Sequence, residues 1–210
     1  MTDEWIYNGR PDGARFLPER IAEPARTEIE DDIWSWVVRG EEDAAEFAGY
    51  LEGDDVREGI TDEELASAYD RALAVRRSQQ REWGTVHSNL TLAFAELNDL
   101  GVLARQNFAC CGTCAAAEIH GERDGSRHWR GYLWFHEQDT ESLIAGGALY
   151  LGYGAYDAPE AGYQAAVERL MDDVVFPVLH RHGMRPDWNR NLSTRVHVTG
   201  AHWYAPLGGT

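Results

Sequence analysis

The spacing of the apolar residues changes near Gly101, and this change limits the chain to a fold that mixes helices and strands. Before Gly101, apolar residues recur at intervals of three and four, which is typical of amphipathic helices. After it, short alternating and aromatic segments lie between turn-forming residues, which is typical of strands. We therefore predict an α+β protein with a helical N-terminal part followed by a small mixed sheet.

Two helix-start signals stand out in the first part of the chain. Thr27 with Glu30, and Thr61 with Glu64, have the spacing of a capping box, in which each side chain bonds the backbone N–H of the other residue. From these starts we predict three regions. They are an extended arm over residues 1–26, an acidic and mainly helical region over 27–101, and an α+β region over 102–210 that forms one compact domain together with 62–101.

The second part has the element order strand, helix, strand, strand, helix, strand, strand. This order matches a split β-α-β (ferredoxin-like) arrangement with an extra final strand. A right-handed crossover would make the predicted strands 102–108 and 131–136 parallel, and we expect strand 148–153 to lie between them. Because parallel strands end at the same edge of a sheet, the residues that follow the first two strands are expected to lie close together.

All the cysteines of the chain lie within residues 107–120, NFACCGTCAAAEIH, where a predicted strand gives way to a short helix. The segment FHEQD ends the next strand and is expected at the same edge. Cysteine pairs spaced C-x-x-C supply two ligands of the kind that zinc prefers, and a histidine can add a third. We predict a transition-metal site, with zinc as the metal, whose ligands come from Cys110, Cys111, Cys114 and His136. Glu137 and Asp139 are expected beside it as supporting or acid–base groups.

Other interpretations of these residues stay open. Cysteine is among the most buried residue types, so the three thiols could simply pack at a tight strand–helix junction. Alternatively, a helix start lowers the pKa of a thiol, which would suit a C-x-x-C thiol oxidoreductase that uses Cys111 and Cys114. Asp139 or Thr140 could cap the helix that follows.

The negative charge is concentrated at one end of the chain. The formal net charge is −17, and residues 1–70 carry 21 acidic residues against 6 arginines. Such a surface argues against nucleic-acid binding, which requires basic groups that displace counterions. It suits contact with a basic partner, so the alternative function that we weigh is an acidic interaction or inhibitor protein, of the kind that covers a toxin as an immunity protein does.

Three further features of the sequence indicate the cellular compartment of the protein. No apolar run approaches the roughly 18–20 residues that span a bilayer, and the first residues lack the pattern of a secretory signal. An odd number of clustered cysteines makes a poor disulfide framework. We expect a cytoplasmic protein with reduced thiols and no membrane partner.

Three motifs together resemble an uncharacterised family of bacterial proteins known as a domain of unknown function. They are NF-x-CC-x-x-C over residues 107–114, FH-x-QDTE over 135–141 and LYL-x-YG over 149–154. The resemblance spans roughly residues 62–200 and leaves out the acidic first sixty residues. It implies no established activity, but it joins the cysteine segment and the FH-x-QDTE segment in one signature.

Overall fold

The computed structural model describes residues 5–52, 57 and 59–208. The chain divides into two compact units. Unit 1 contains residues 1–86 and 204–210, and unit 2 contains residues 87–203.

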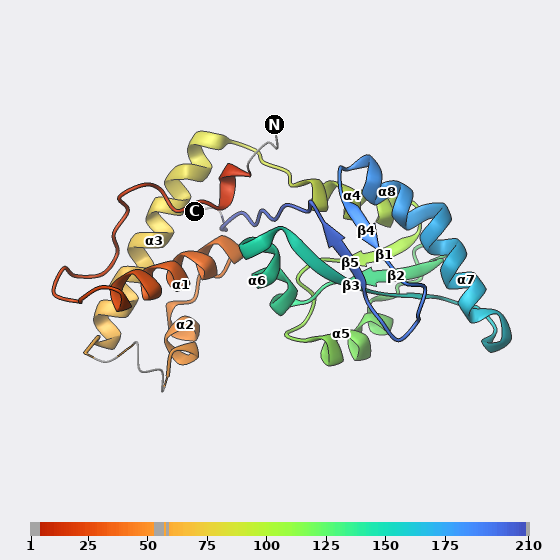
Figure 1. Cartoon of the computed structure of the whole chain (residues 1–210), viewed down its shortest axis with the longest axis horizontal. Helices are drawn as coiled ribbons and strands as arrows, with labels where there is room; N and C mark the ends of the chain where they lie inside the picture. The colour runs from red at the N-terminus through yellow and green to blue at the C-terminus, as the bar shows by residue number, and fades with distance from the viewer. Residues whose placement is uncertain (1–4, 53–56, 58, 209–210) are drawn as a thin grey trace. The chain divides into compact units, whose positions relative to one another are not determined.

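Unit 1 is helical. Its described elements are η1 (Ile6–Asn8), α1 (Ala25–Arg39), α2 (Ala44–Tyr50) and α3 (Asp62–Trp83). Both α1 and α2 pack against α3 (Figure 1). Their contact faces are fully buried and consist of apolar side chains at helical spacing: Ile29, Ile33, Val37, Phe47, Leu65, Ala68, Tyr69 and Ala72.

The predicted capping box at Thr27 and Glu30 is wrong. Helix α1 begins earlier, at Ala25, so that Glu30 lies in its interior and is fully buried. Its carboxylate accepts hydrogen bonds from the backbone N–H groups of Phe16 and Leu17, at 2.8 and 2.9 Å. Glu30 therefore holds the backbone of Phe16 and Leu17 onto α1 instead of capping the helix.

The second predicted capping box is confirmed. The Thr61 side chain accepts the backbone N–H of Glu64, and the Glu64 carboxylate accepts the backbone N–H of Thr61. Helix α3 ends before Gly84, whose φ of 67° lies in the left-handed region that favours glycine.

Unit 2 contains the sheet and the helices that cover it. In chain order its described elements are α4 (Asn89–Asp99), β1 (Val102–Arg105), α5 (Gly112–Glu118), η3 (Ile119–Glu122), β2 (Gly131–Trp134), α6 (Glu137–Gly146), β3 (Ala148–Ala155), η4 (Glu160–Gly162), α7 (Tyr163–Leu170), the π-helical turn η5 (Met171–Val175), α8 (Phe176–Arg181), β4 (Arg185–Asp187) and β5 (Val196–Thr199). The α+β class and the mixed sheet after a helical N-terminal part are confirmed.

The five described strands have the spatial order β1-β2-β3-β5-β4. Strands β1 and β2 are parallel, as predicted, whereas the other neighbouring pairs are antiparallel. The expected place of residues 148–153 between the parallel strands is wrong, because β1 and β2 bond each other directly and β3 lies on the far side of β2. The arrangement is therefore a plain β-α-β unit extended by antiparallel strands, not the split form.

The two faces of the sheet are covered differently (Figure 1). Helices α4, α7 and α8 lie on one face, and α5 lies on the other. Under α5 a small buried cluster joins the helix to β1 and β2; its members are Leu103, Ala115, Ile119, Trp129 and Trp134. On this same face the Trp134 indole crosses Gly152 of β3, where an added Cβ would lie 2.3 Å from ring carbons.

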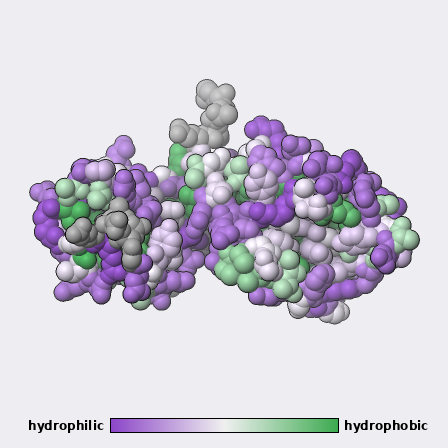
Figure 2. All heavy atoms as spheres, turned by 60° about the horizontal axis from the view of Figure 1, so that its bottom comes forward, coloured by the Kyte–Doolittle hydropathy of each residue, from purple (hydrophilic) through white to green (hydrophobic). Residues whose placement is uncertain are grey.

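The surface is mainly polar on the face shown in Figure 2, where hydrophobic residues form small, separate patches. Among the residues that the structure describes, no helix is long and apolar enough to cross a membrane.

Candidate metal centre

The cysteine segment and the FHEQD segment lie side by side at one edge of the sheet. Strands β1 and β2 end opposite each other, and the chain continues from both as a short irregular ladder. In this ladder the Phe108 N–H donates to the Phe135 carbonyl at 2.8 Å, and the Glu137 N–H donates to the Ala109 carbonyl at 3.2 Å. The parallel pairing of the strands thus places the loop that carries the cysteines next to the start of α6.

The loop before the cysteines has a strained backbone. Asn107 and Ala109 both have positive φ, at 49° and 63°, although neither is glycine. The Asn107 side chain is held by a hydrogen bond of 2.6 Å from the Thr140 hydroxyl. Such conformations persist where the surrounding contacts impose them, and they are frequent at functional sites.

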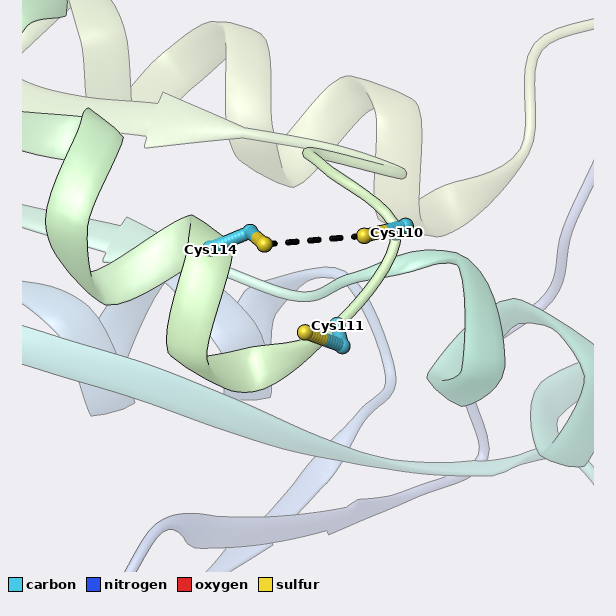
Figure 3. Close-up of side chains that lie close together, drawn as sticks. All are labelled: Cys110, Cys111 and Cys114. Carbon is cyan, nitrogen blue, oxygen red and sulfur yellow. Dashed lines mark hydrogen bonds between the residues drawn. The ribbon is translucent and has the colours of Figure 1, made fainter.

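The three sulfur atoms form one cluster (Figure 3). The Sγ atoms of Cys110, Cys111 and Cys114 all lie within 4.8 Å of one another. The Cys110 and Cys114 sulfurs share a hydrogen bond at 3.6 Å. Cys110 is exposed, and the other two thiols are partly exposed. The alternative that these cysteines are buried packing residues is therefore wrong.

The thiols influence each other's protonation. Hydrogen bonds from the backbone N–H and the thiol of Cys114, together with the backbone N–H of Thr113, lower the pKa of Cys111. Conversely, hydrogen bonds with Cys110 and Cys111, followed by their negative charges, raise the pKa of Cys114 to about 11. Cys111 is therefore expected to lose its proton before Cys114.

His136 lies next to this cluster but does not join it. An added Cβ on Gly112 would lie 3.5 Å from the His136 ring, which places the ring beside the start of α5. The Nδ1 atom of His136 accepts the backbone N–H of Asp139 at 3.3 Å, and Nε2 lies 3.2 Å from the Asp139 carboxylate. The ring is buried, and burial first, then the Arg195 charge, lowers its pKa despite the neighbouring Asp139. Both ring nitrogens of His136 therefore already contact Asp139 of unit 2.

The acidic residues near this histidine have different surroundings. Asp139 is buried and forms a capping box with His136, which is the residue that precedes α6. The helix-capping interpretation is therefore confirmed in part, with His136 and not Asp139 as the N-cap residue. Glu137 is exposed in the first turn of α6, and its backbone N–H holds the cysteine loop.

Arg195 is the residue of this region that the sequence did not indicate. Its Nη1 donates to the Asp139 carboxylate at 2.6 Å and lies 3.0 Å from Nε2 of His136. It comes from the residue before β5, 56 positions after Asp139 along the chain. A lone arginine at the start of a predicted strand carries no spacing signal that could have revealed this contact.

A cavity of about 310 Å³ lies elsewhere, in unit 1. Its lining comes from the end of α3 and the segment after residue 203: Arg77, Gln80, Arg81, Gly84, Tyr204, Pro206, Leu207 and Gly208. It contains no thiol or imidazole, so the concave region and the sulfur cluster are separate features.

Residues 18–206 match the model of a family described as Domain of unknown function (DUF6891). The chain belongs to this family. The DUF6891 match covers most of the chain and includes α1 and α2, so the expectation that the acidic first sixty residues lie outside the family was wrong. No curated protein and no solved structure matches the DUF6891 chain.

Proposed function

We propose that Cys110, Cys111 and Cys114 together bind a thiophilic metal ion, and that this ion is zinc. The observation that carries the proposal is the convergence of three thiols within 4.8 Å on the surface of unit 2. Thiols that only fill a core are buried, and these are not.

The coupled protonation of the cluster supports a cation as its ligand. Hydrogen bonds with Cys110 and Cys111, followed by their negative charges, raise the pKa of Cys114 to about 11. Removing the protons from all three thiols would place like charges side by side. A divalent ion at the centre would offset this repulsion and replace the protons. Metal binding and proton release are therefore expected to occur together.

The sulfur spacing is close to that of a zinc–thiolate site. With zinc–sulfur bonds of about 2.3 Å, tetrahedral geometry places sulfur atoms about 3.8 Å apart. The sulfurs of Cys110 and Cys114 already lie 3.6 Å apart. Three protein ligands would leave a fourth position for water or a small molecule, an arrangement that is typical of catalytic zinc sites.

His136 is not assigned as a ligand, because Asp139 occupies both of its ring nitrogens. Its role in the proposal is to hold the start of α6 next to the cysteine loop. Asp139 and Arg195 in turn hold the ring of His136.

The test is zinc content and affinity, measured on untagged protein purified without chelators. Elemental mass spectrometry should find zinc equimolar with the chain, and competition with a chromophoric chelator gives the affinity. The zinc affinity should fall in each of the variants Cys110→Ser, Cys111→Ser and Cys114→Ser. The loss should exceed the roughly 10–100-fold that removal of a supporting residue costs. Wild-type protein that holds no more zinc than a variant with all three serines would exclude the proposal.

Two histidine variants complete this test. His180→Gln removes an exposed imidazole on α8 and should leave zinc binding unchanged. His136→Gln removes the ring beside the cluster and should retain equimolar zinc, with at most the loss expected of a supporting residue. Complete loss of zinc in His136→Gln alone would instead make this histidine a ligand.

A second candidate function, binding of a basic protein, is supported by an exposed aromatic residue in unit 1. Tyr50 is 60% exposed, and its ring lies 5.3 Å from that of Trp36. Residues 28–55 contain eleven acidic residues and one arginine. Aromatic rings within negative surroundings attract arginine through cation–π and charge contacts.

An arginine-rich peptide is a suitable probe of this surface. Its affinity, measured by fluorescence anisotropy, should fall as salt is raised and should fall further in Tyr50→Ala. The matched control is Tyr150→Ala, which removes an exposed tyrosine of unit 2 (48% exposed) and should leave the affinity unchanged. Equal binding by both variants would remove Tyr50 from the proposal.

A further inference from the structure

The three thiols of the cluster are not equivalent in position. Cys110 is exposed, whereas Cys111 and Cys114 are partly covered. The Cys110 sulfur lies 3.6 Å from that of Cys114, and Figure 3 shows the two side chains pointing toward one another from the loop and from the first turn of α5. This pair is separated by three residues and is distinct from the C-x-x-C pair that the sequence suggested.

We propose that Cys110 and Cys114 form a reversible redox pair that exchanges with small disulfides, while Cys111 remains a thiol. The inference adds to the proposed metal centre and rests on it in one respect, namely that bound zinc should slow the oxidation of the pair. The formation of the disulfide itself requires only the metal-free protein.

Geometry favours this pair over the alternatives. A disulfide bond is about 2.05 Å long and joins Cα atoms that are usually about 4.4–6.8 Å apart. Adjacent residues such as Cys110 and Cys111 have Cα atoms only about 3.8 Å apart, so that pair is disfavoured. For Cys110 and Cys114 the sulfurs need to approach by about 1.5 Å.

Position and exposure account for the different role of Cys111. It is the residue that precedes α5, and it is partly covered, whereas Cys110 is exposed. The Cys110 sulfur, and not that of Cys111, shares the hydrogen bond of 3.6 Å with the Cys114 sulfur. Cys110 is therefore the thiol that a bulky disulfide can reach.

The exchange balances in two steps. The Cys110 thiolate attacks one sulfur of a disulfide R–S–S–R, which forms a mixed disulfide and releases one R–S⁻. The Cys114 thiolate then attacks the Cys110 sulfur, which forms the Cys110–Cys114 bond and releases the second R–S⁻. The two cysteine protons pass to the two released thiolates, so one disulfide is reduced to two thiols and the protein pair is oxidised.

The full chain offers a direct measurement, because it contains no other cysteines. Metal-free protein is equilibrated anaerobically with mixtures of reduced and oxidised glutathione, quenched with acid and alkylated with a maleimide. Trypsin cleavage after Arg105 and Arg123 places all three cysteines in one peptide. Fragmentation of this peptide by mass spectrometry should find the maleimide on Cys111, with Cys110 and Cys114 joined.

Two variants sharpen the assignment. Cys111→Ser should still form the disulfide at a similar glutathione ratio, whereas Cys110→Ser should need a mixture at least about tenfold more oxidising. Maleimide found on Cys110, or Cys110→Ser oxidised as readily as wild type, would overturn the proposal. Circular dichroism on each variant confirms that the fold is retained.

Measurements on zinc-loaded protein distinguish failure of the redox pair from failure of the metal centre. Zinc-loaded wild type should react with oxidised glutathione at least about tenfold more slowly than the metal-free form. If metal-free protein forms the Cys110–Cys114 bond but equimolar zinc does not bind, the redox pair stands and the metal centre fails. If zinc binds but the maleimide is on Cys110, the metal centre stands and the redox pair fails.

Discussion

The Arg195 guanidinium donates to the Asp139 carboxylate at 2.6 Å and so joins the start of β5 to the first turn of α6. The side chain of Asp139 is 5% exposed and that of Arg195 is 35% exposed. The same carboxylate also accepts the backbone N–H of His136 at 3.2 Å. This contact therefore holds the start of α6 in place, and the cysteine loop is bonded to the start of α6.

Replacing Asp139 by asparagine should lower the free energy of unfolding by about 2–3 kcal/mol, because it removes a buried charge partner of Arg195. Urea denaturation checks this value. The matched control is Asp173→Asn, which changes an exposed carboxylate in η5 and should shift stability by less than about 0.5 kcal/mol. Equal effects of the two substitutions would contradict the importance of the pair.

Glu30 should contribute to the acid sensitivity of unit 1. Burial raises the pKa of its carboxyl, but the N–H groups of Leu17 and Phe16 and the Arg15 guanidinium outweigh burial and lower it overall. A lowered carboxyl pKa gives stability that is present above the ordinary glutamate value and is lost as the pH falls through the folded-state pKa. Below a pH of about 4.5, wild type should therefore lose stability more steeply than Glu30→Gln.

The same substitution tests the size of this contribution at neutral pH. Glu30→Gln should cost about 2–4 kcal/mol, since the amide cannot accept from two N–H groups and also balance the arginine. Glu28→Gln, at an exposed position of α1, serves as the control in denaturation at pH 7 and pH 4. A parallel pH dependence in Glu30→Gln and wild type would show that Glu30 is not the responsible group.

Ala109→Gly should stabilise the protein by about 0.5–1 kcal/mol, because glycine adopts the positive φ of 63° without the steric cost that alanine has there. Thermal denaturation measures the gain. Ala117→Gly, in the exposed interior of α5, should have the opposite sign by a similar amount. A loss of stability in Ala109→Gly would mean that the loop is not strained in solution.

Alkylation should distinguish Cys111 from Cys114 in metal-free protein. The backbone and thiol hydrogen bonds lower the pKa of Cys111, whereas the neighbouring thiols raise the pKa of Cys114 to about 11. Because the thiolate is the reacting form, iodoacetamide at pH 7 should modify Cys111 well before Cys114. Peptide mass spectrometry at short reaction times gives the order, and faster labelling of Cys114 would contradict the assigned hydrogen bonds.

Gly152→Ala should disturb the support of the cysteine loop. The new Cβ would lie 2.3 Å from Cε2 and Cζ2 of the Trp134 indole, and the Cη2 atom of the same ring lies 3.8 Å from where a Cβ on Gly112 would be. Overpacking of this kind typically costs about 1–3 kcal/mol. Gly146→Ala, where an added Cβ has no neighbour within 4 Å, should be close to neutral in denaturation experiments. Zinc affinity should fall in the first variant and remain unchanged in the second.

The sequence predicted those features that depend on neighbours along the chain. Thr61 and Glu64 are three residues apart, and their capping box formed as expected. Cys110, Cys111 and Cys114 are equally local, so their convergence followed from a single turn of chain. Thr27 and Glu30 have the same spacing as the correct capping box, but burial against Phe16 and Leu17 overrode it.

Contacts between distant residues could not be predicted in this way. Nothing in the sequence around His136 indicates that Arg195, 59 positions later in the chain, lies 3.0 Å from its ring. The position of β3 was wrong for a related reason. The alternation of 148–153 identifies a strand and its faces but does not determine which neighbour it pairs with.

The division into units has a consequence for the order of events during protein synthesis. Unit 1 includes Tyr204 and Leu207, which are buried, and the Leu207 backbone bonds the Gln80 side chain of α3. These residues follow the whole of unit 2 along the chain. The helices of unit 1 are translated before unit 2. Part of their apolar surface therefore stays uncovered until every residue of unit 2 has been translated. Unit 2 has no such delay and can finish folding before the unit that precedes it.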